Sequence, residues 1–157
     1  MKKLLSILII IFFISCSTAQ KKKQHYKVTK TETEWISILS PAEYNVLREA
    51  GTEIPFSHPY DTNKSKGVYV CAACNTPLYL SKFKYDSGSG WPSFDRAVKE
   101  SVELDIDYEI GIARTELKCN TCGGHLGHSF DDGPKTTGKR HCINGAALKF
   151  IPEESKR

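Results

Sequence analysis

The chain has 157 residues and a net charge of +4, with 39% hydrophobic and 25% charged residues. This composition is typical of one globular domain of ordinary size and excludes a disordered chain, and the small charge is no signature of nucleic-acid binding. Six cysteines are too few for a disulfide-dense miniprotein, so each cysteine needs its own explanation.

The first residues have the form of a signal peptide. Two lysines precede an almost wholly apolar run at residues 4–14, which is too short to span a bilayer. The run ends at Cys16, which resembles a lipobox cysteine that is acylated after cleavage. We therefore expect residues 1–15 to be removed and the protein to be a periplasmic or otherwise extracytoplasmic lipoprotein of the cell envelope. Cleavage after Ala19, which would release a secreted protein, remains an alternative.

The next stretch is polar and is predicted to be a tether. Residues 16–33 include a run of three lysines and would lift a folded domain off the membrane. We place that domain at residues 34–151, followed by a short tail at residues 152–157.

A small helical region is expected at the start of the domain. Ser40 can cap a helix that begins with Pro41, and Glu43 can close a capping box. Gly51 is a natural end for this helix. A further turn of helix is expected over residues 34–39.

Short β segments follow. Strands are predicted at residues 67–70, 77–80, 112–118 and 146–151. Between residues 102 and 110, apolar side chains alternate with acidic ones, which predicts a strand with one buried apolar face and one solvated acidic face. An acidic cation site is the weaker alternative. Because there are no internal repeats and no alternation of helices with strands, we expect a mainly β, antiparallel fold.

Two CxxC pairs, Cys71 with Cys74 and Cys119 with Cys122, have metal-ligand spacing. Each pair puts two thiolates on one turn, and two such turns complete a tetrahedral four-sulfur shell that suits Zn²⁺. A filled shell leaves no open position, so this zinc would stabilise the fold and not catalyse. Two disulfides, or a redox-active pair, remain alternatives that the repeated spacing argues against.

The remaining cysteine, Cys142, is a candidate nucleophile. It follows three potentially cationic residues, 139–141, whose charge would lower the pKa of the thiol. Upstream, His125 and His128 flank a small residue and can act as proton donors. The alternatives are an inert core cysteine and a metal-binding or turn-forming histidine pair.

Residues 86–94 form a loop rich in serine and glycine that cannot be helical. Such a loop can present Trp91 to a ligand. A buried tryptophan on a turn is the alternative.

Together these segments resemble the B-type peptide methionine-sulfoxide reductases, which act on the R epimer at sulfur. The matching pieces are residues 51–56, the two CxxC pairs, and residues 87–94, 125–130, 132–134 and 140–148. They occur in the order of the family over roughly residues 34–151. The resemblance implies a mainly β fold of two antiparallel sheets with short N-terminal helices and a distal zinc site. It also implies reduction of methionine-R-sulfoxide in oxidised proteins or peptides.

The resemblance implies catalytic roles as well. Cys142 matches the cysteine that attacks the sulfoxide sulfur as a thiolate and becomes a sulfenic acid. His125 and His128 match histidines that help to protonate the departing oxygen. Arg140 matches a basic neighbour of the nucleophile, and Asn144 matches a residue that positions substrate and water.

The implied substrate contacts are apolar. Trp91 matches the indole that receives the methyl group of the substrate, and Phe94 is a second candidate contact. An apolar wall opposite donors for the oxygen would select one epimer of the chiral sulfoxide.

The chain departs from the family at two positions. Ser89 stands where many members carry a second, resolving cysteine. We therefore predict that an external thiol, such as a thioredoxin-like protein or a small thiol, reduces Cys142 directly. His141 stands where family members usually have an aromatic residue.

Two other functions remain open at this stage. One is a zinc-stabilised protein-interaction module, and the other is a different thiol enzyme such as a peroxidase. We expect a monomer that contacts the membrane only through its lipid and has no nucleic-acid partner.

Overall fold

The computed structural model of the chain describes residues 25–154. The predicted signal peptide, the lipidation of Cys16 and the first half of the predicted tether, residues 16–24, lie outside the described residues. Within residues 25–154, no helix has the length and apolar character needed to cross a membrane.

Helix α2, Pro41–Glu49, forms as predicted. The hydroxyl of Ser40 accepts the N–H of Glu43, and the Glu43 carboxylate accepts the N–H of Ser40 at 2.8 Å, which completes the capping box. The helix ends one residue earlier than expected, because Ala50 and not Gly51 takes the left-handed conformation, with φ of 56°.

Helix α1, Glu32–Ile38, begins before the predicted end of the tether. Thr31 caps it with a second capping box. The N–H of Val28 donates to Thr121 at 2.9 Å, and the hydroxyl of Tyr26 donates to Glu103 at 3.1 Å. The last part of the stretch that was expected to be a free tether therefore lies on the domain.

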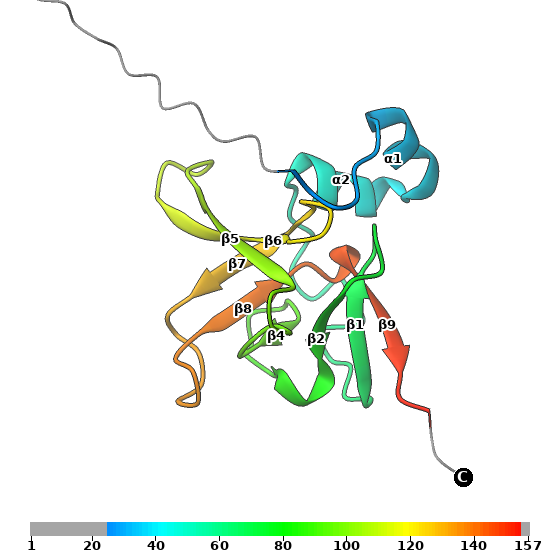
Figure 1. Cartoon of the computed structure of the whole chain (residues 1–157). Coiled ribbons are helices and arrows are strands. Elements are labelled where there is room, and N and C mark those ends of the chain that lie inside the picture. Colours follow the sequence, from blue (N-terminus) through cyan, green and yellow to red (C-terminus); the bar gives the residue numbers. More distant parts are fainter. Residues whose placement is uncertain (1–24, 155–157) are drawn as a thin grey trace, which may run out of the picture.

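Nine strands and two short 3₁₀ helices complete the described fold (Figure 1). The small sheet has the order β2-β1-β9, from Pro77–Leu80, Gly67–Cys71 and Leu148–Pro152. The large sheet has the order β3-β4-β8-β7-β6-β5, from Lys84–Tyr85, Ser93–Phe94, Arg140–Ile143, His125–Phe130, Arg114–Cys119 and Val102–Asp107. The 3₁₀ helices are Ser81–Phe83 and Gly145–Ala147. All strand pairs are antiparallel, which confirms the predicted fold class.

Aromatic side chains join the two sheets. Phe94 of the large sheet stacks on Tyr79 with ring centroids 4.3 Å apart and meets the edge of Tyr69 at 5.2 Å. All three rings are fully buried. This contact fixes β4 beside β8 and so positions the strand that carries Cys142.

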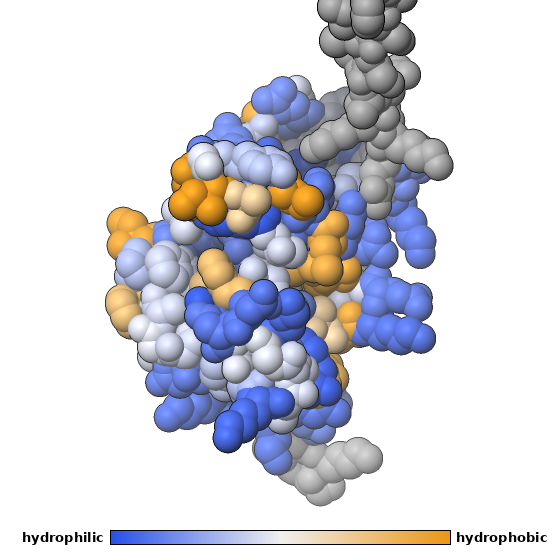
Figure 2. Space-filling view, turned by 90° about the vertical axis from the view of Figure 1, so that its left-hand side faces the viewer, coloured by the Kyte–Doolittle hydropathy of each residue, from blue (hydrophilic) through white to orange (hydrophobic). Residues whose placement is uncertain are grey.

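The prediction for the alternating strand was wrong about its faces. Strand β5 ends at Asp107, and the apolar row of the hairpin is open to solvent, with 58–68% exposure for Leu104, Ile106, Tyr108, Ile110 and Ile112. The acidic row points inward, where Asp105 accepts from Lys118 at 2.7 Å and Asp107 accepts from His128 at 2.8 Å. The faces differ from the prediction because β5 lies at the edge of the large sheet, where it pairs only with β6. In Figure 1 the β5–β6 hairpin projects to the left, and Figure 2 shows the molecule from that side. Apolar groups on this face are separated by polar surface.

Candidate active site

The four CxxC cysteines form one cluster. All four sulfurs lie within 4.8 Å of one another, with Cys71 and Cys122 at 3.8 Å and Cys74 and Cys119 at 3.6 Å. These distances are well beyond the roughly 2 Å of a disulfide bond. The cluster can therefore hold one metal ion, as the spacing predicted.

The two cysteine turns have the backbone that such a knuckle needs. Asn75 and Gly123, which follow the second cysteine of each pair, have φ of 58° and 71°. Sulfur contacts, foremost with Cys119, raise the pKa of Cys71 and lower that of Cys74. Four thiolates this close require a cation between them, and a soft four-sulfur donor set suits Zn²⁺.

Cys142 lies on β8, opposite Ser93 of β4 and His128 of β7. It opens into a pocket of about 130 Å³. The other lining residues are Thr52, Trp91, Arg114, His128, Phe130 and Asn144. The structure therefore brings together four residues that the sequence analysis singled out, Cys142, Trp91, His128 and Asn144.

A glycine lets the histidine strand approach the cysteine strand. A Cβ on Gly127 would lie 2.0 Å from the carbonyl oxygen of Cys142. Only a residue without a side chain fits between His125 and His128 at this point, and the two strands can then pair closely.

The electrostatic prediction for Cys142 was wrong. Burial raises the pKa of this thiol, and the contacts with Ser89 and Arg140 oppose the rise without reversing it. The Ser89 hydroxyl lies 3.9 Å from the Cys142 sulfur. Arg140 forms a bidentate ion pair with Asp132, in which both N–O distances are 2.8 Å.

The two neighbouring cationic residues also have other partners. Lys139 pairs with Asp131. His141 contacts the hydroxyl of Tyr79 through its Nδ1 at 3.2 Å, and burial lowers its pKa. Neither residue supplies the positive charge that the sequence suggested for the nucleophile.

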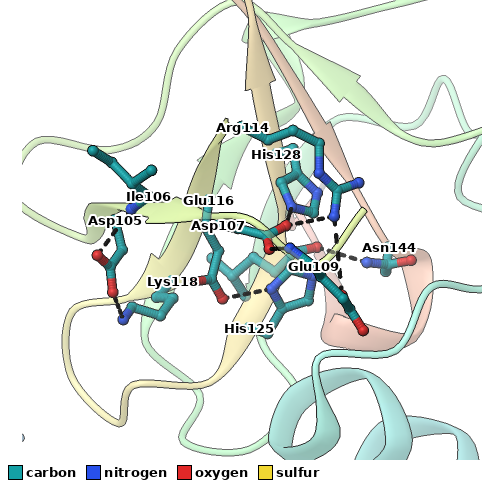
Figure 3. A network of polar contacts seen from close by, with 11 residues as sticks. Asp105, Ile106, Asp107, Glu109, Arg114, Glu116, Lys118, His125, His128 and Asn144 are labelled. Carbon is teal, nitrogen blue, oxygen red and sulfur yellow. Dashed lines mark hydrogen bonds and ion pairs between the residues drawn. The ribbon is translucent and has the colours of Figure 1, made fainter. Parts of the chain in front are cut away.

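The two histidines have different surroundings (Figure 3). His128 lines the Cys142 pocket and donates from Nε2 to Asp107 at 2.8 Å, and burial lowers its pKa. His125 donates from Nδ1 to Glu116 at 2.7 Å and lines a separate cavity. Its ring centroid is 5.3 Å from that of His128, so His125 stands behind the pocket.

The structure corrects the assignment of Phe94 as a substrate contact. Phe94 has no exposed surface, because its strand turns this side chain into the aromatic core. The second apolar wall of the pocket is Phe130, at the end of β7. Trp91 does line the pocket, and its indole N–H donates to the carbonyl of Glu53 at 3.1 Å.

Glu53 is a residue that the sequence analysis missed. Its carboxylate accepts the N–H of Gly145 at 2.6 Å and of Ala146 at 2.9 Å. Its own N–H donates to the side-chain oxygen of Asn144 at 3.0 Å. One residue thus links Trp91 to the segment that follows the nucleophile. The only available signal was its place within the matching residues 51–56.

Asp107 and Arg114 were also missed. They face each other across the β5–β6 hairpin and form an ion pair. Arg114 reaches the Cys142 pocket, and Asp107 contacts His128. The alternating pattern had assigned Asp107 to the solvated face, so its role was hidden.

Residues 39–152 match the SelR domain. The chain belongs to the SelR family. The chain is 50% identical to the peptide methionine sulfoxide reductase MsrB of Leptospira interrogans over 82% of its length and 99% of the relative. It is 50% identical to MsrB of Agrobacterium fabrum over 80% of its length and 94% of the relative. The methionine-R-sulfoxide reductase B3, mitochondrial, of mouse is 46% identical over 86% of this chain and 54% of the mouse protein.

The SelR match covers every residue of the pocket and all four cysteines of the cluster. It begins after α1, so this helix and its capping box lie outside the SelR domain.

Proposed function

We propose that this SelR protein reduces methionine-R-sulfoxide in oxidised proteins or peptides to methionine. The carrying observation is the pocket at Cys142, where a thiol, the apolar side chains of Trp91 and Phe130, and the polar side chains of His128 and Asn144 meet. A volume of about 130 Å³ suits one thioether-sized side chain. The names of the relatives, peptide methionine sulfoxide reductase MsrB, support the same reaction.

In the proposed reaction, the Cys142 sulfur attacks the sulfoxide sulfur. The oxygen passes to Cys142, the thiol proton goes to that oxygen, and the products are methionine and a Cys142 sulfenic acid. Burial raises the pKa of Cys142 and so favours the protonated thiol in the resting protein. His128, whose Nε2–H is held by Asp107, can accept the thiol proton at Nδ1 and pass it to the departing oxygen.

The apolar and polar parts of the pocket select the epimer. Trp91 and Phe130 offer the methyl group a surface free of donors. Asn144 lies in the same pocket, and its amide nitrogen has a second N–H for the oxygen beside the one that donates to the Leu126 carbonyl. The mirror-related sulfoxide would exchange the two groups and place its oxygen against the rings, where it would lose its hydrogen bonds.

We further propose that an external thiol regenerates Cys142 directly. Ser89, which lies 3.9 Å from the Cys142 sulfur, cannot form a disulfide. The other four cysteines of the described chain lie together in the metal cluster. A first thiol attacks the sulfenic acid and releases water, which leaves a mixed disulfide. A second thiol then attacks this mixed disulfide and releases Cys142. Both thiols come from a thioredoxin-like protein or from a small-molecule thiol.

The four-cysteine cluster is proposed as a structural zinc site. A bound ion would tie the end of β1, at Cys71, to the end of β6, at Cys119. None of its ligands lines the Cys142 pocket, so the ion would supply stability and take no part in the reaction. Metal analysis should find about one zinc per chain, and a stably folded, metal-free protein would refute this assignment.

The location in the cell envelope stays a proposal that rests on the sequence. Cys16 at the end of an apolar run supports a lipid anchor and an extracytoplasmic domain. Substituting Cys16→Ser should move the protein from the membrane to the soluble fraction. Recovery of a mature protein that begins after Ala19 would instead establish secretion.

The test of the main proposal uses a peptide that contains methionine sulfoxide, prepared as separate R and S epimers, with dithiothreitol as reductant. We expect turnover of the R epimer only and none in Cys142→Ser. Glu49→Ala serves as the control, because Glu49 is exposed and lies outside both the pocket and the cysteine cluster. Failure to reduce the R epimer, or full activity in Cys142→Ser, would refute the proposal. Turnover of hydrogen peroxide in place of the sulfoxide would establish a peroxidase.

A further inference from the structure

Arg114 opens β6 and stands in the wall of the Cys142 pocket. Its side chain is only 22% exposed, which is low for a guanidinium on an edge hairpin. A charged group held at this depth beside a nucleophile needs partners for its donors.

The donors of Arg114 are only partly used. One terminal nitrogen, Nη2, pairs with Asp107 and lies 3.9 Å from the carboxylate of Glu109. The Nε–H is buried and has no partner among the described residues. A guanidinium presents five N–H groups in a rigid fork, so this side chain has donors to spare at the pocket.

A sulfoxide oxygen is the acceptor that fits these donors. It carries partial negative charge, has no proton to donate, and gains charge as the Cys142 sulfur attacks. The thioether product has no such oxygen, so an arginine in this position would favour substrate over product. We propose that Arg114 is a substrate-binding and catalytic residue that donates hydrogen bonds to the sulfoxide oxygen. This inference rests on the function proposed above.

Asp107 positions Arg114 for this task (Figure 3). The same carboxylate oxygen, Oδ2, accepts from Arg114 and from Nε2 of His128. The other oxygen accepts the backbone N–H of Glu109 at 2.6 Å. These bonds, led by the one from Glu109, hold the pKa of Asp107 at about 2, so the carboxylate stays charged. Arg114 and His128 are thus both fixed on Asp107 and lie together at the pocket.

His128 and Arg114 differ in charge and therefore in what they can contribute. Burial lowers the pKa of His128, and the charge of Arg114 adds to that effect. His128 is therefore neutral near pH 7, with its one N–H on Asp107, while Arg114 supplies the permanent positive charge that the developing oxyanion needs.

The test compares two substitutions on the same strand. Arg114→Met keeps the aliphatic stem and removes the donors. Lys118→Met is the matched control, because Lys118 also pairs across the hairpin, with Asp105 at 2.7 Å, and does not line the pocket. Loss of one preorganised donor to an oxyanion typically lowers the rate by about 10²–10³, and we expect a fall of that size in kcat/KM for Arg114→Met alone. A fall of less than about threefold, or an equal fall in Lys118→Met, would overturn the proposal.

A binding measurement keeps this test separate from that of the reaction. In a Cys142→Ser background, tryptophan fluorescence reports binding of the R-sulfoxide peptide and of the same peptide with unoxidised methionine. We expect Arg114→Met to weaken the sulfoxide peptide about tenfold or more and to leave the methionine peptide within about twofold. Arg114→Lys, which keeps the charge and loses the fork, should lie between. Unchanged discrimination between the two peptides overturns the role of Arg114, even if the wild-type protein reduces the sulfoxide. Lost discrimination supports it, even if no turnover occurs.

Discussion

Removing the carboxylate of Glu53 should destabilise the fold and disorganise the pocket. The change Glu53→Ala deletes the acceptor of two backbone N–H groups, from Gly145 at 2.6 Å and Ala146 at 2.9 Å. The bonds from the Glu53 backbone to Asn144 and Trp91 remain possible in the variant. These backbone bonds then depend on a loop that has lost its side-chain hydrogen bonds to Gly145 and Ala146.

The magnitude follows from the two bonds. A hydrogen bond to a charged group contributes about 1.5–3 kcal/mol, and Glu53 is half-buried, which favours the lower end. We therefore expect Glu53→Ala to lower the free energy of unfolding by about 3 kcal/mol. Glu53→Gln keeps one acceptor oxygen and should lose about half of that amount.

Urea denaturation measures this change as a shift in midpoint at constant slope. The matched control is Glu49→Ala, since Glu49 is exposed and its carboxylate accepts only a side-chain bond from Asn45 at 3.2 Å. That variant should stay within about 0.5 kcal/mol of the wild type. A loss below about 1 kcal/mol in Glu53→Ala, or equal losses in both variants, would refute the reasoning.

Three more predictions concern the nucleophile and its neighbours. The rate at which iodoacetamide alkylates Cys142 should rise with pH and inflect above the pKa of a free thiol, because burial raises the pKa of Cys142; an inflection below that of glutathione would contradict this. Phe94→Ala should lower the free energy of unfolding by about 3–5 kcal/mol and leave KM unchanged in the folded fraction, whereas a raised KM with normal stability would restore Phe94 as a substrate contact. In Ser89→Cys, mass spectrometry after one turnover should detect a disulfide between positions 89 and 142. A sulfenic acid that persists in this variant would show that the two positions do not meet.

The features that were predictable from the sequence are those that depend on neighbouring residues. The capping box of Ser40 and Glu43 needs only four consecutive residues, and it forms as expected. The cysteine turns are also local, and the repeated spacing was enough to predict that Cys71 and Cys119 would lie in one cluster.

The features that were not predictable depend on which element covers which face. The alternation in β5 identified the strand but not its buried side, because that side depends on the edge position of β5. Arg114 lines the pocket and Glu53 binds the segment after Cys142, each far along the chain from its partners, and no local pattern marks either residue. The thiol of Cys142 was misjudged for the same reason. The sequence shows adjacent cations, whereas the structure pairs Arg140 with Asp132 and buries the thiol.

The most direct test of the account is a single turnover without reductant. The wild-type protein is mixed with excess R-sulfoxide peptide and then with dimedone, which traps sulfenic acids. The account predicts about one methionine peptide per chain, one dimedone adduct located at Cys142, and no product from the S epimer. Absence of product from the R epimer would contradict the proposed function, and an internal disulfide in place of the adduct would contradict direct reduction by an external thiol.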